Sequence, residues 1–325
     1  MRTALRLALL LAVIAVFGAA VAGWLGWERY NEPGPLAEAA TVIIEPGDGP
    51  RRIASKLDAA GVIGDPMLFL AAVRLTERGG RLKAGEFRFE AGTSMRTVIG
   101  DIVAGRTVVR RITVPEGLTS WQIAALLDDA PALDGETPVA EEGALLPETY
   151  HYNHGDSRAA IVERMRAARD AALADLWAGR AEGLPLRTPG EAVILASIVE
   201  KETGVAGERP RVAAVFVNRL RKGMRLQSDP TVIYALTEGK ADLGRPLSRA
   251  DLKTDSPYNT YAVKGLPPTA IANPGRAALE AVLNPSQTNE LYFVADGSGG
   301  HAFAKTLAEH NRNVRRWRRL QRENE

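Results

Sequence analysis

A stretch of 21 residues without a charged side chain, Leu7 to Trp27, opens the sequence and limits the folds available to it. As a helix it would span about 31 Å, which matches the hydrocarbon core of a bilayer. Arg2 and Arg6 precede it, and positive charge favours the cytoplasmic side of a membrane span. The sequence therefore predicts a membrane anchor over residues 1–30 with its N-terminus in the cytoplasm, a linker at 31–40, and an exported remainder at the inner membrane.

A cleaved signal peptide is the alternative interpretation of the same stretch. Ala20-Val21-Ala22 fits a small-residue cleavage site. The apolar run continues past this site to Trp27, which is longer than the apolar region of a typical signal peptide. This length favours the uncleaved anchor, and both interpretations place the rest of the chain outside the cytoplasm.

The composition is that of a folded protein and excludes several kinds of chemistry. The 325 residues suggest two or three domains. Lys and Arg number 41 against 39 Asp and Glu, a balance that argues against nucleic acid as a partner. There is no cysteine, so disulfides and thiolate metal sites are excluded, and the four histidines are scattered. We therefore expect no metal and no cofactor.

Three segments share one local pattern: an extended run, a glycine, a polar capping residue, and then a short amphipathic helix. The glycines are Gly47, Gly92 and Gly117. In each segment the first apolar helix residue follows six after the glycine and the next four later, which places both on one helix face. With a further helix over about 65–77, residues 41–110 resemble the small LysM-like βααβ module, whose families bind cell-wall glycans. Whether this module binds glycan stays open.

The helix predicted from Thr188 to Glu202 carries the first candidate catalytic group. Thr188 caps it, Pro189 suits its first turn, and apolar residues occupy nearly every position up to Glu200. A carboxyl group close to this buried sector would resist ionisation, as a general acid near neutral pH requires. Glu202 lies about 200° away around the helix and cannot form a facing pair with it. The alternative is a solvated Glu that merely ends the apolar run.

Two later segments contain candidate groups for binding a sugar. Gln227 and Asp229 precede a proline and a predicted helix, where Asp229 could also serve as an N-cap. Asn259 and Tyr261 lie in a long irregular segment, where amides suit sugar hydroxyls and aromatic rings pack on pyranose faces. Ordinary turn chemistry is the alternative for this second pair. The arginine-rich run 312–322 suggests an anionic or membrane-surface contact, or else a solvated basic helix.

Taken together, these motifs resemble the endolytic murein transglycosylase family, the MltG or YceG-like proteins. The fragments follow one another in order from the membrane anchor to the final helix. One departure is Leu145-Leu146-Pro147-Glu148-Thr149-Tyr150, where the family usually has a Phe-Pro-Asp version. The matching fragments are Ala196–Thr203, Phe216–Leu220, Gly223–Tyr234, Tyr258–Tyr261, Gly265–Pro268, Leu291–Ala295 and Glu309–Asn311.

The resemblance implies an α+β protein whose residues 111–325 form a helix-rich catalytic domain. By position in the motif, Glu200 matches the family's catalytic glutamate. The implied enzyme is a lyase that cleaves the bond between N-acetylmuramic acid and N-acetylglucosamine in nascent peptidoglycan strands and leaves a 1,6-anhydro end. Gln227, Asp229, Asn259 and Tyr261 are then candidates for positioning the substrate, and murein synthases are expected as partners by resemblance only.

Two other functions stay open from the sequence. One is an exported glycan-binding scaffold without activity. The other is a hydrolase of the same bond, with Asp229 or Glu148 as the base that activates water.

Overall fold

The computed structural model describes residues 2–323 and mixes helices with two-stranded sheets, as predicted. The chain divides into two compact units. The first contains the chain up to Arg110 together with Asn153–Gly155, and the second contains Arg111–Tyr152 and the chain from Asp156 onward. Each unit is described by itself below.

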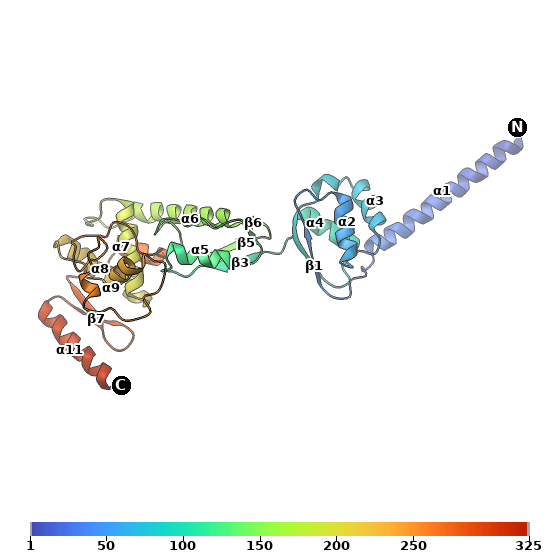
Figure 1. Ribbon diagram of the computed structural model, residues 1–325. Helices are drawn as coiled ribbons and strands as arrows, with labels where there is room; N and C mark the ends of the chain where they lie inside the picture. Colours follow the sequence, from blue (N-terminus) through green and yellow to red (C-terminus); the bar gives the residue numbers. More distant parts are fainter. Residues whose placement is uncertain (1, 324–325) are drawn as a thin grey trace. The chain divides into compact units, whose positions relative to one another are not determined.

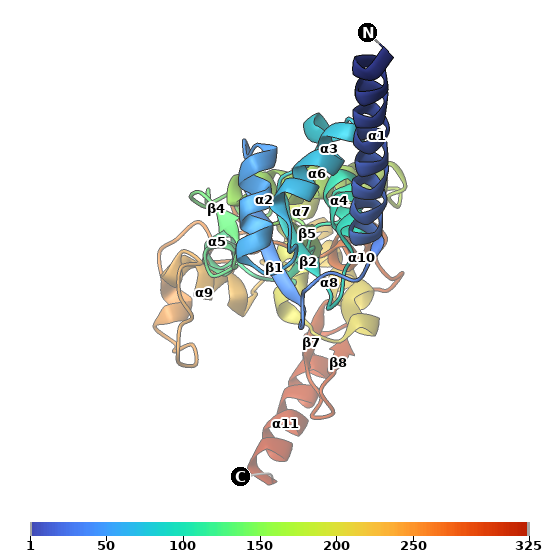
Figure 2. The ribbon, with the colours of Figure 1, turned by 90° about the vertical axis from the view of Figure 1, so that its right-hand side faces the viewer.

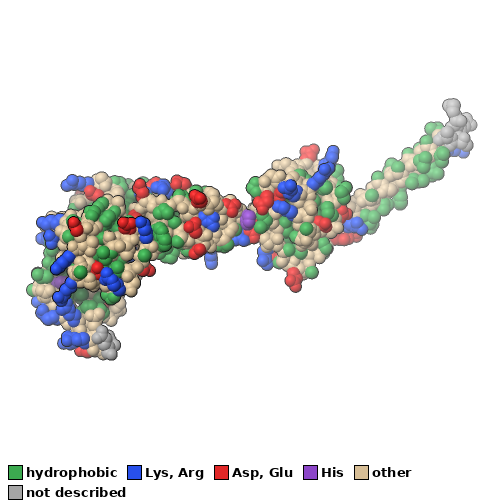
Figure 3. Space-filling model, viewed as in Figure 1, with side chains coloured by type: hydrophobic (Ala, Val, Ile, Leu, Met, Phe, Trp, Pro, Cys, Tyr) green, Lys and Arg blue, Asp and Glu red, His purple; other side chains and the backbone are tan. Residues whose placement is uncertain are grey.

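Helix α1 (Arg2–Asn31) begins the first unit and carries an almost continuous apolar surface (Figure 3). Its segment Leu5–Asn31 reaches a mean hydropathy of 2.5 and is long enough to cross a membrane. These properties are compatible with the predicted single-pass anchor, and a signal sequence would share them.

The first unit contains a βααβ arrangement. Strand β1 (Ala40–Ile44) pairs antiparallel with β2 (Gly85–Phe89), with Val42 opposite Phe87. Helices α2 (Pro50–Ala59) and α3 (Pro66–Leu75) and the short 3-10 turn at Gly79–Arg81 connect the two strands, and α4 (Met95–Ala104) follows β2 (Figure 2). The element order agrees with the prediction, while the relation of this unit to LysM modules stays a prediction.

The three repeated glycines each turn the chain into a helix. Gly47, Gly92 and Gly117 have φ angles of 90°, 68° and 79°, a region that side chains with a Cβ rarely adopt. They precede α2, α4 and α5 (Ser120–Asp128), respectively, as predicted, and Ser94 and Thr119 cap α4 and α5 through their side chains. The predicted polar cap is wrong for α2, which begins after Gly49 without a side-chain cap, because the Asp48 carboxylate binds Lys56 and the N–H of Glu45 instead. The apolar pairs at the predicted spacing are all at most 1% exposed: Ile53 and Leu57, Val98 and Ile102, Ile123 and Leu127.

Short strand pairs and a long helix begin the second unit. Strand β3 (Arg110–Thr113) pairs with β5 (Thr149–Tyr152), and β4 (Leu133–Asp134) pairs in parallel with β6 (Asp156–Ser157). Helix α6 (Arg158–Ala178) follows and buries Ile161, Val162 and Met165 against α5 and these strands.

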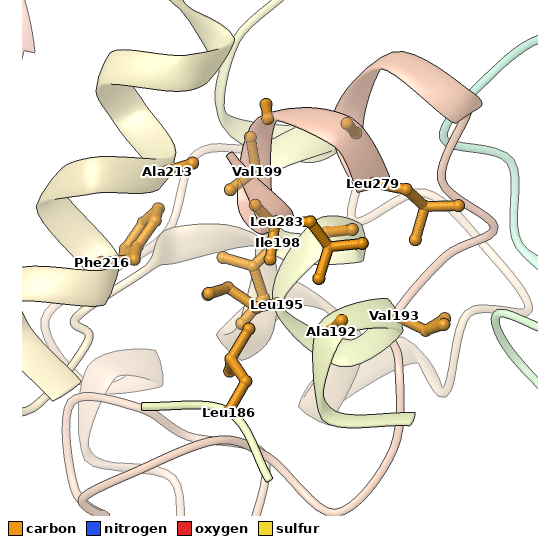
Figure 4. Packing of buried hydrophobic residues seen from close by; sticks show 14 of the residues in the cluster. Leu186, Ala192, Val193, Leu195, Ile198, Val199, Ala213, Phe216, Leu279 and Leu283 are labelled. Carbon is orange, nitrogen blue, oxygen red and sulfur yellow. The ribbon is translucent and has the colours of Figure 1, made fainter. Parts of the chain in front are cut away.

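Three helices form the main core of the second unit and position the candidate acid. Helix α7 (Pro189–Glu202) packs against α8 (Arg209–Arg221; Figure 1) and against α10 (Arg276–Leu283). Leu195, Ile198 and Val199 of α7 are fully buried among apolar side chains of all three helices (Figure 4). Burial on nearly every side explains why the apolar run of α7 shows little helical periodicity.

The remaining elements of the second unit follow the core. Helix α9 (Asp229–Thr237) precedes a long irregular segment that contains a 3-10 turn at Asp251–Lys253, and a second 3-10 turn at Ala206–Glu208 leads into α8. Strands β7 (Tyr292–Ala295) and β8 (His301–Ala304) form an antiparallel hairpin, and α11 (Leu307–Glu323) lies beside it (Figure 2).

Candidate active site

The Glu200 carboxyl group lies at the C-terminal end of α7 and is nearly inaccessible to solvent. Its side chain is 4% exposed. One carboxyl oxygen accepts a hydrogen bond from the backbone N–H of Gly275 at 2.9 Å, and the other accepts one from Nη2 of Arg209 at 3.0 Å. The prediction that this carboxyl belongs to the buried sector of α7 is therefore confirmed.

A second carboxylate, Glu116, shares the same arginine. Its Oε2 lies 3.0 Å from Nη2 of Arg209, as does Oε1 of Glu200. Both oxygens contact one nitrogen, so they are at most about 6 Å apart. The Glu116 side chain is 40% exposed, so it forms the more open side of the cluster.

Gly275 leaves the space in which the Glu116 carboxyl lies, whereas Gly117 only borders the Glu200 side chain. A Cβ atom at Gly275 would come within 1.8 Å of Oε1 of Glu116. A Cβ at Gly117 would lie 3.5 Å from Cγ of Glu200 and 3.5 Å from Cδ of Lys201. Any residue at position 275 with a Cβ atom would therefore push the Glu116 carboxyl out of its present position.

Burial is the main electrostatic influence on Glu200. It raises the pKa of the carboxyl, and the negative charge of Glu116 acts in the same direction. The Gly275 N–H and Arg209 oppose this because they stabilise the carboxylate form, yet the net direction is upward. The site thus favours a carboxyl that still carries its proton at pH values where a solvated glutamate has lost it.

The predicted residues Asp229 and Tyr261 lie together, next to the end of α7. The Tyr261 hydroxyl donates to Oδ1 of Asp229 at 2.6 Å. Ser228 donates through its Oγ to Oε1 of Glu202, which links this group to α7 through Glu202. Gln227 is exposed and has a φ of 52°, a left-handed conformation that its neighbours must stabilise.

Asn259 is fully buried and its amide bonds to the backbone of its own loop. Its Nδ2 donates to the carbonyl oxygens of Leu252 and Thr254, and its Oδ1 accepts the N–H of Tyr261 at 3.0 Å. The geometry gives this amide a role in orienting Tyr261. Its predicted contact with substrate stays a prediction, as do those of Gln227, Asp229 and Tyr261.

A pocket of about 340 Å³ opens beside Lys201, the residue after Glu200. Lys201 donates through Nζ to the Gly117 carbonyl at 3.2 Å, and Glu200 itself does not line this pocket. Polar and aromatic side chains of α5, α9 and the segment after α9 form the lining: Thr119, Gln122, Tyr234, Thr237, Asp242 and Arg245.

The pH dependence of stability provides a test of the network around Glu202. Burial raises the pKa of Glu202 to about 7, above its ordinary value of 4.5. A raised carboxyl pKa stabilises the fold at low pH, and this contribution is lost as the pH rises from about 4.5 through 7. We expect the urea concentration at the unfolding midpoint of the native chain to decrease as the pH is raised from 5 to 8. In Glu202→Gln the midpoint should decrease less steeply over the same range.

Glu142 has a similarly raised pKa of about 7, so Glu202→Gln should still show part of the decrease of the urea midpoint with pH. Glu280→Gln changes an exposed carboxylate on α10 and serves as the control with a native slope. An identical slope in Glu202→Gln and the native chain would contradict the assignment.

Comparison with known proteins identifies the family. Residues 42–316 match the sequence profile of the YceG-like family. The chain belongs to the YceG-like family. An endolytic murein transglycosylase of Bacillus subtilis (strain 168) is 32% identical over 308 residues, covering 83% of this chain and 82% of the relative. The family resemblance inferred from the sequence motifs is thereby confirmed.

Two further relatives of this YceG-like chain extend the comparison. An endolytic murein transglycosylase of Streptococcus pneumoniae (serotype 2, strain D39) is 29% identical, and the match covers 84% of this chain but only 57% of that relative. The 2.6 Å crystal structure of a YceG-like protein from Listeria monocytogenes is similar with a TM-score of 0.54 and 31% identity, covering 85% of this chain and 98% of the other.

Three members of the Glu200 cluster were not identified from the sequence. Glu116, Arg209 and Gly275 come from different segments, and only the folded chain brings them to Glu200. The one available signal for Glu116 was its position directly before Gly117, a repeated glycine.

Proposed function

We propose that this YceG-like chain is a membrane-anchored endolytic murein transglycosylase, a lyase acting on peptidoglycan. The observation that carries the proposal is the buried Glu200 carboxyl, whose pKa is raised by burial at the end of α7. The printed names of the Bacillus and Streptococcus relatives agree with this activity. The N-terminal apolar helix fits attachment to the membrane, with the N-terminus in the cytoplasm and the second unit outside.

In the proposed first step Glu200 donates its proton to the glycosidic oxygen between N-acetylmuramic acid and N-acetylglucosamine. The C1–O bond breaks, the leaving sugar departs as an alcohol, and C1 acquires oxocarbenium character. A group that stays protonated near neutral pH suits this role. Burial acts in this direction here because it raises the pKa of Glu200, and the Gly275 N–H orients the carboxyl.

In the second step Glu200, now a carboxylate, takes the proton of the C6 hydroxyl of the same muramic acid. The C6 oxygen attacks C1 and closes a 1,6-anhydro ring. The enzyme regains its proton and no water is consumed. Attack within one sugar has a large entropic advantage over attack by a separate molecule.

Glu116 gives the competing hydrolase a specific basis, because it is a second carboxylate close to the acid. Inverting hydrolases separate their two carboxyl groups by about 6.5–9.5 Å to admit a water molecule. The oxygens of Glu116 and Glu200 that share Arg209 are closer than this range. Nη2 of Arg209 lies between these two oxygens and so occupies the place in which an inverting hydrolase would hold its water molecule.

Mass spectrometry of the products tests the proposal. The full chain, in mild detergent, is incubated with purified peptidoglycan, and the released fragments are weighed. We expect anhydro-muramic ends; hydrolysis would give ends heavier by about 18 Da, one water. Reducing ends only would establish a hydrolase, and no released fragments would favour the glycan-binding scaffold.

A further inference from the structure

The arginine at the site is held in an unusual way. Nη2 of Arg209 donates both to Glu116 and to Glu200, each at 3.0 Å. Its Nε is buried and has no hydrogen-bond partner among the residues that the structure describes. Arginine normally binds a carboxylate through two parallel N–H groups, which is its strongest pairing. Here neither carboxylate has that pairing, although Arg209 retains the groups to form it.

We propose that Glu116 is a positioning residue that holds Arg209 in a shared hydrogen bond, prevents it from forming a two-pronged pair with Glu200, and so keeps Glu200 able to carry a proton. This inference rests on the proposed acid role of Glu200. Without Glu116, the guanidinium is free to turn and offer a second N–H to Glu200. A two-pronged ion pair would stabilise the carboxylate and oppose its protonation.

The position of Glu116 is built into the backbone around it. The N–H of Gly117 donates to the carbonyl of Asn273 at 3.0 Å, which fixes the Glu116 segment against the loop before α10. The Glu116 carboxyl occupies the space that a side chain at Gly275 would fill. Gly275 has φ −73° and ψ 168°, a conformation open to any residue, so close approach accounts for the glycine here and backbone strain does not.

Charged side chains from four parts of the second unit lie near Glu200, and the one that binds its carboxyl directly is that of Arg209. Arg209 comes from α8 and Glu116 from the segment after β3. On α7 itself, Lys201 is directed to the Gly117 carbonyl and Glu202 to Ser228. The first residue of α10, Arg276, pairs with Asp175. After burial and the Gly275 N–H, the charged side chains that act on the pKa of Glu200 are therefore Glu116, which raises it, and Arg209, which lowers it.

The pH dependence of kcat/KM for glycan cleavage by the full chain tests the inference. Activity falls at high pH as Glu200 loses its proton, so this alkaline limb reports the pKa of Glu200. Glu116→Gln removes the competing carboxylate, and we expect the limb to move down by about one pH unit or more. Arg209→Gln removes the cation, and we expect the limb to move up. A purely structural role would lower activity without moving the limb in opposite directions.

Gly275→Ala provides a second test, one that removes no ionisable group. The new Cβ displaces the Glu116 carboxyl, so we expect the limb to move down as in Glu116→Gln. Glu280→Gln, an exposed carboxylate on α10, is the control with a native profile. An unmoved limb in both Glu116→Gln and Gly275→Ala would overturn the inference.

The acid role itself is tested separately by Glu200→Gln. If that variant stays active, the proposed function of Glu200 fails. If Glu200→Gln is inactive while the alkaline limbs of the pH profiles of Glu116→Gln and Gly275→Ala stay at the native position, only the inference about Glu116 fails.

Discussion

Glu200→Gln is expected to lower the rate of glycan-strand cleavage by about 10²–10⁴-fold, because a primary amide cannot donate a proton to the leaving oxygen. Gln has nearly the same shape as Glu and can still accept the Gly275 N–H through its oxygen, while its NH₂ group cannot accept from Arg209, which keeps its bond to Glu116. The fold and substrate binding should therefore be retained. The measurement is the initial rate of anhydro-fragment release from purified peptidoglycan, together with binding of the variant to the same material.

Glu280→Gln is the matched control, since it makes the same chemical change on the exposed side of α10. We expect native activity from it. Anhydro fragments released by Glu200→Gln at more than about a tenth of the native rate would remove Glu200 from the proton-transfer steps. Loss of activity accompanied by loss of the folded state would instead assign Glu200 a structural role.

The local features of this fold were predictable because they depend on neighbours in the sequence. Thr188 and Pro189 predict the start of α7, and its apolar run predicts that the helix is buried. The three repeated glycines predict three strand-to-helix corners, since the local backbone conformation decides them and a polar side chain caps two of the three helices. The same reasoning placed Glu200 at the edge of the core.

The surroundings of Glu200 were not predictable because they depend on distant segments. Glu116 lies 84 positions before Glu200, and Gly275 lies 75 positions after it. Nothing in the periodicity of α7 shows which backbone N–H or which guanidinium will reach the carboxyl. The pairing of Tyr261 with Asp229, 32 positions apart, is of the same kind: both residues were candidates, but their contact required the structure.

Asn259 shows how a correct residue type can have an unexpected local role. An amide in an irregular loop suits a sugar, but it also suits the loop's own backbone. All described hydrogen bonds of the Asn259 side chain join it to backbone carbonyl and N–H groups of residues 252, 254 and 261. The sequence alone cannot separate these roles, because both require the same polar side chain.

Asn273→Ala is expected to destabilise the second unit by about 3–5 kcal/mol, since it leaves several buried polar groups without partners at about 1–3 kcal/mol each. Asn273 is fully buried. Its Oδ1 accepts the N–H of Leu145 at 2.9 Å, and its Nδ2 donates to Oγ of Ser120 at 3.0 Å and to the Leu118 carbonyl at 3.2 Å. These bonds join three segments that are distant in sequence.

Urea denaturation of the full chain in mild detergent measures this loss, and Asn311→Ala is the control. Asn311 is exposed on α11, so its substitution is expected to change the free energy of unfolding by less than about 0.5 kcal/mol. A loss below about 1 kcal/mol in Asn273→Ala would show that water or rearrangement replaces the missing bonds.

Asn273 also couples stability to the proposed chemistry. Its backbone carbonyl accepts the Gly117 N–H, which holds the Glu116 segment, and it lies two residues before Gly275, whose N–H contacts Glu200. Loosening this loop should disturb both neighbours of the acid at once. The Gly275 N–H stabilises the Glu200 carboxylate more strongly than Glu116 opposes it. We therefore expect the Asn273→Ala variant that remains folded at low temperature to show an upward shift of the alkaline limb, opposite to that of Gly275→Ala. A native pH profile in that folded fraction would mean that the Gly117 and Gly275 backbones keep their positions without the Asn273 side chain.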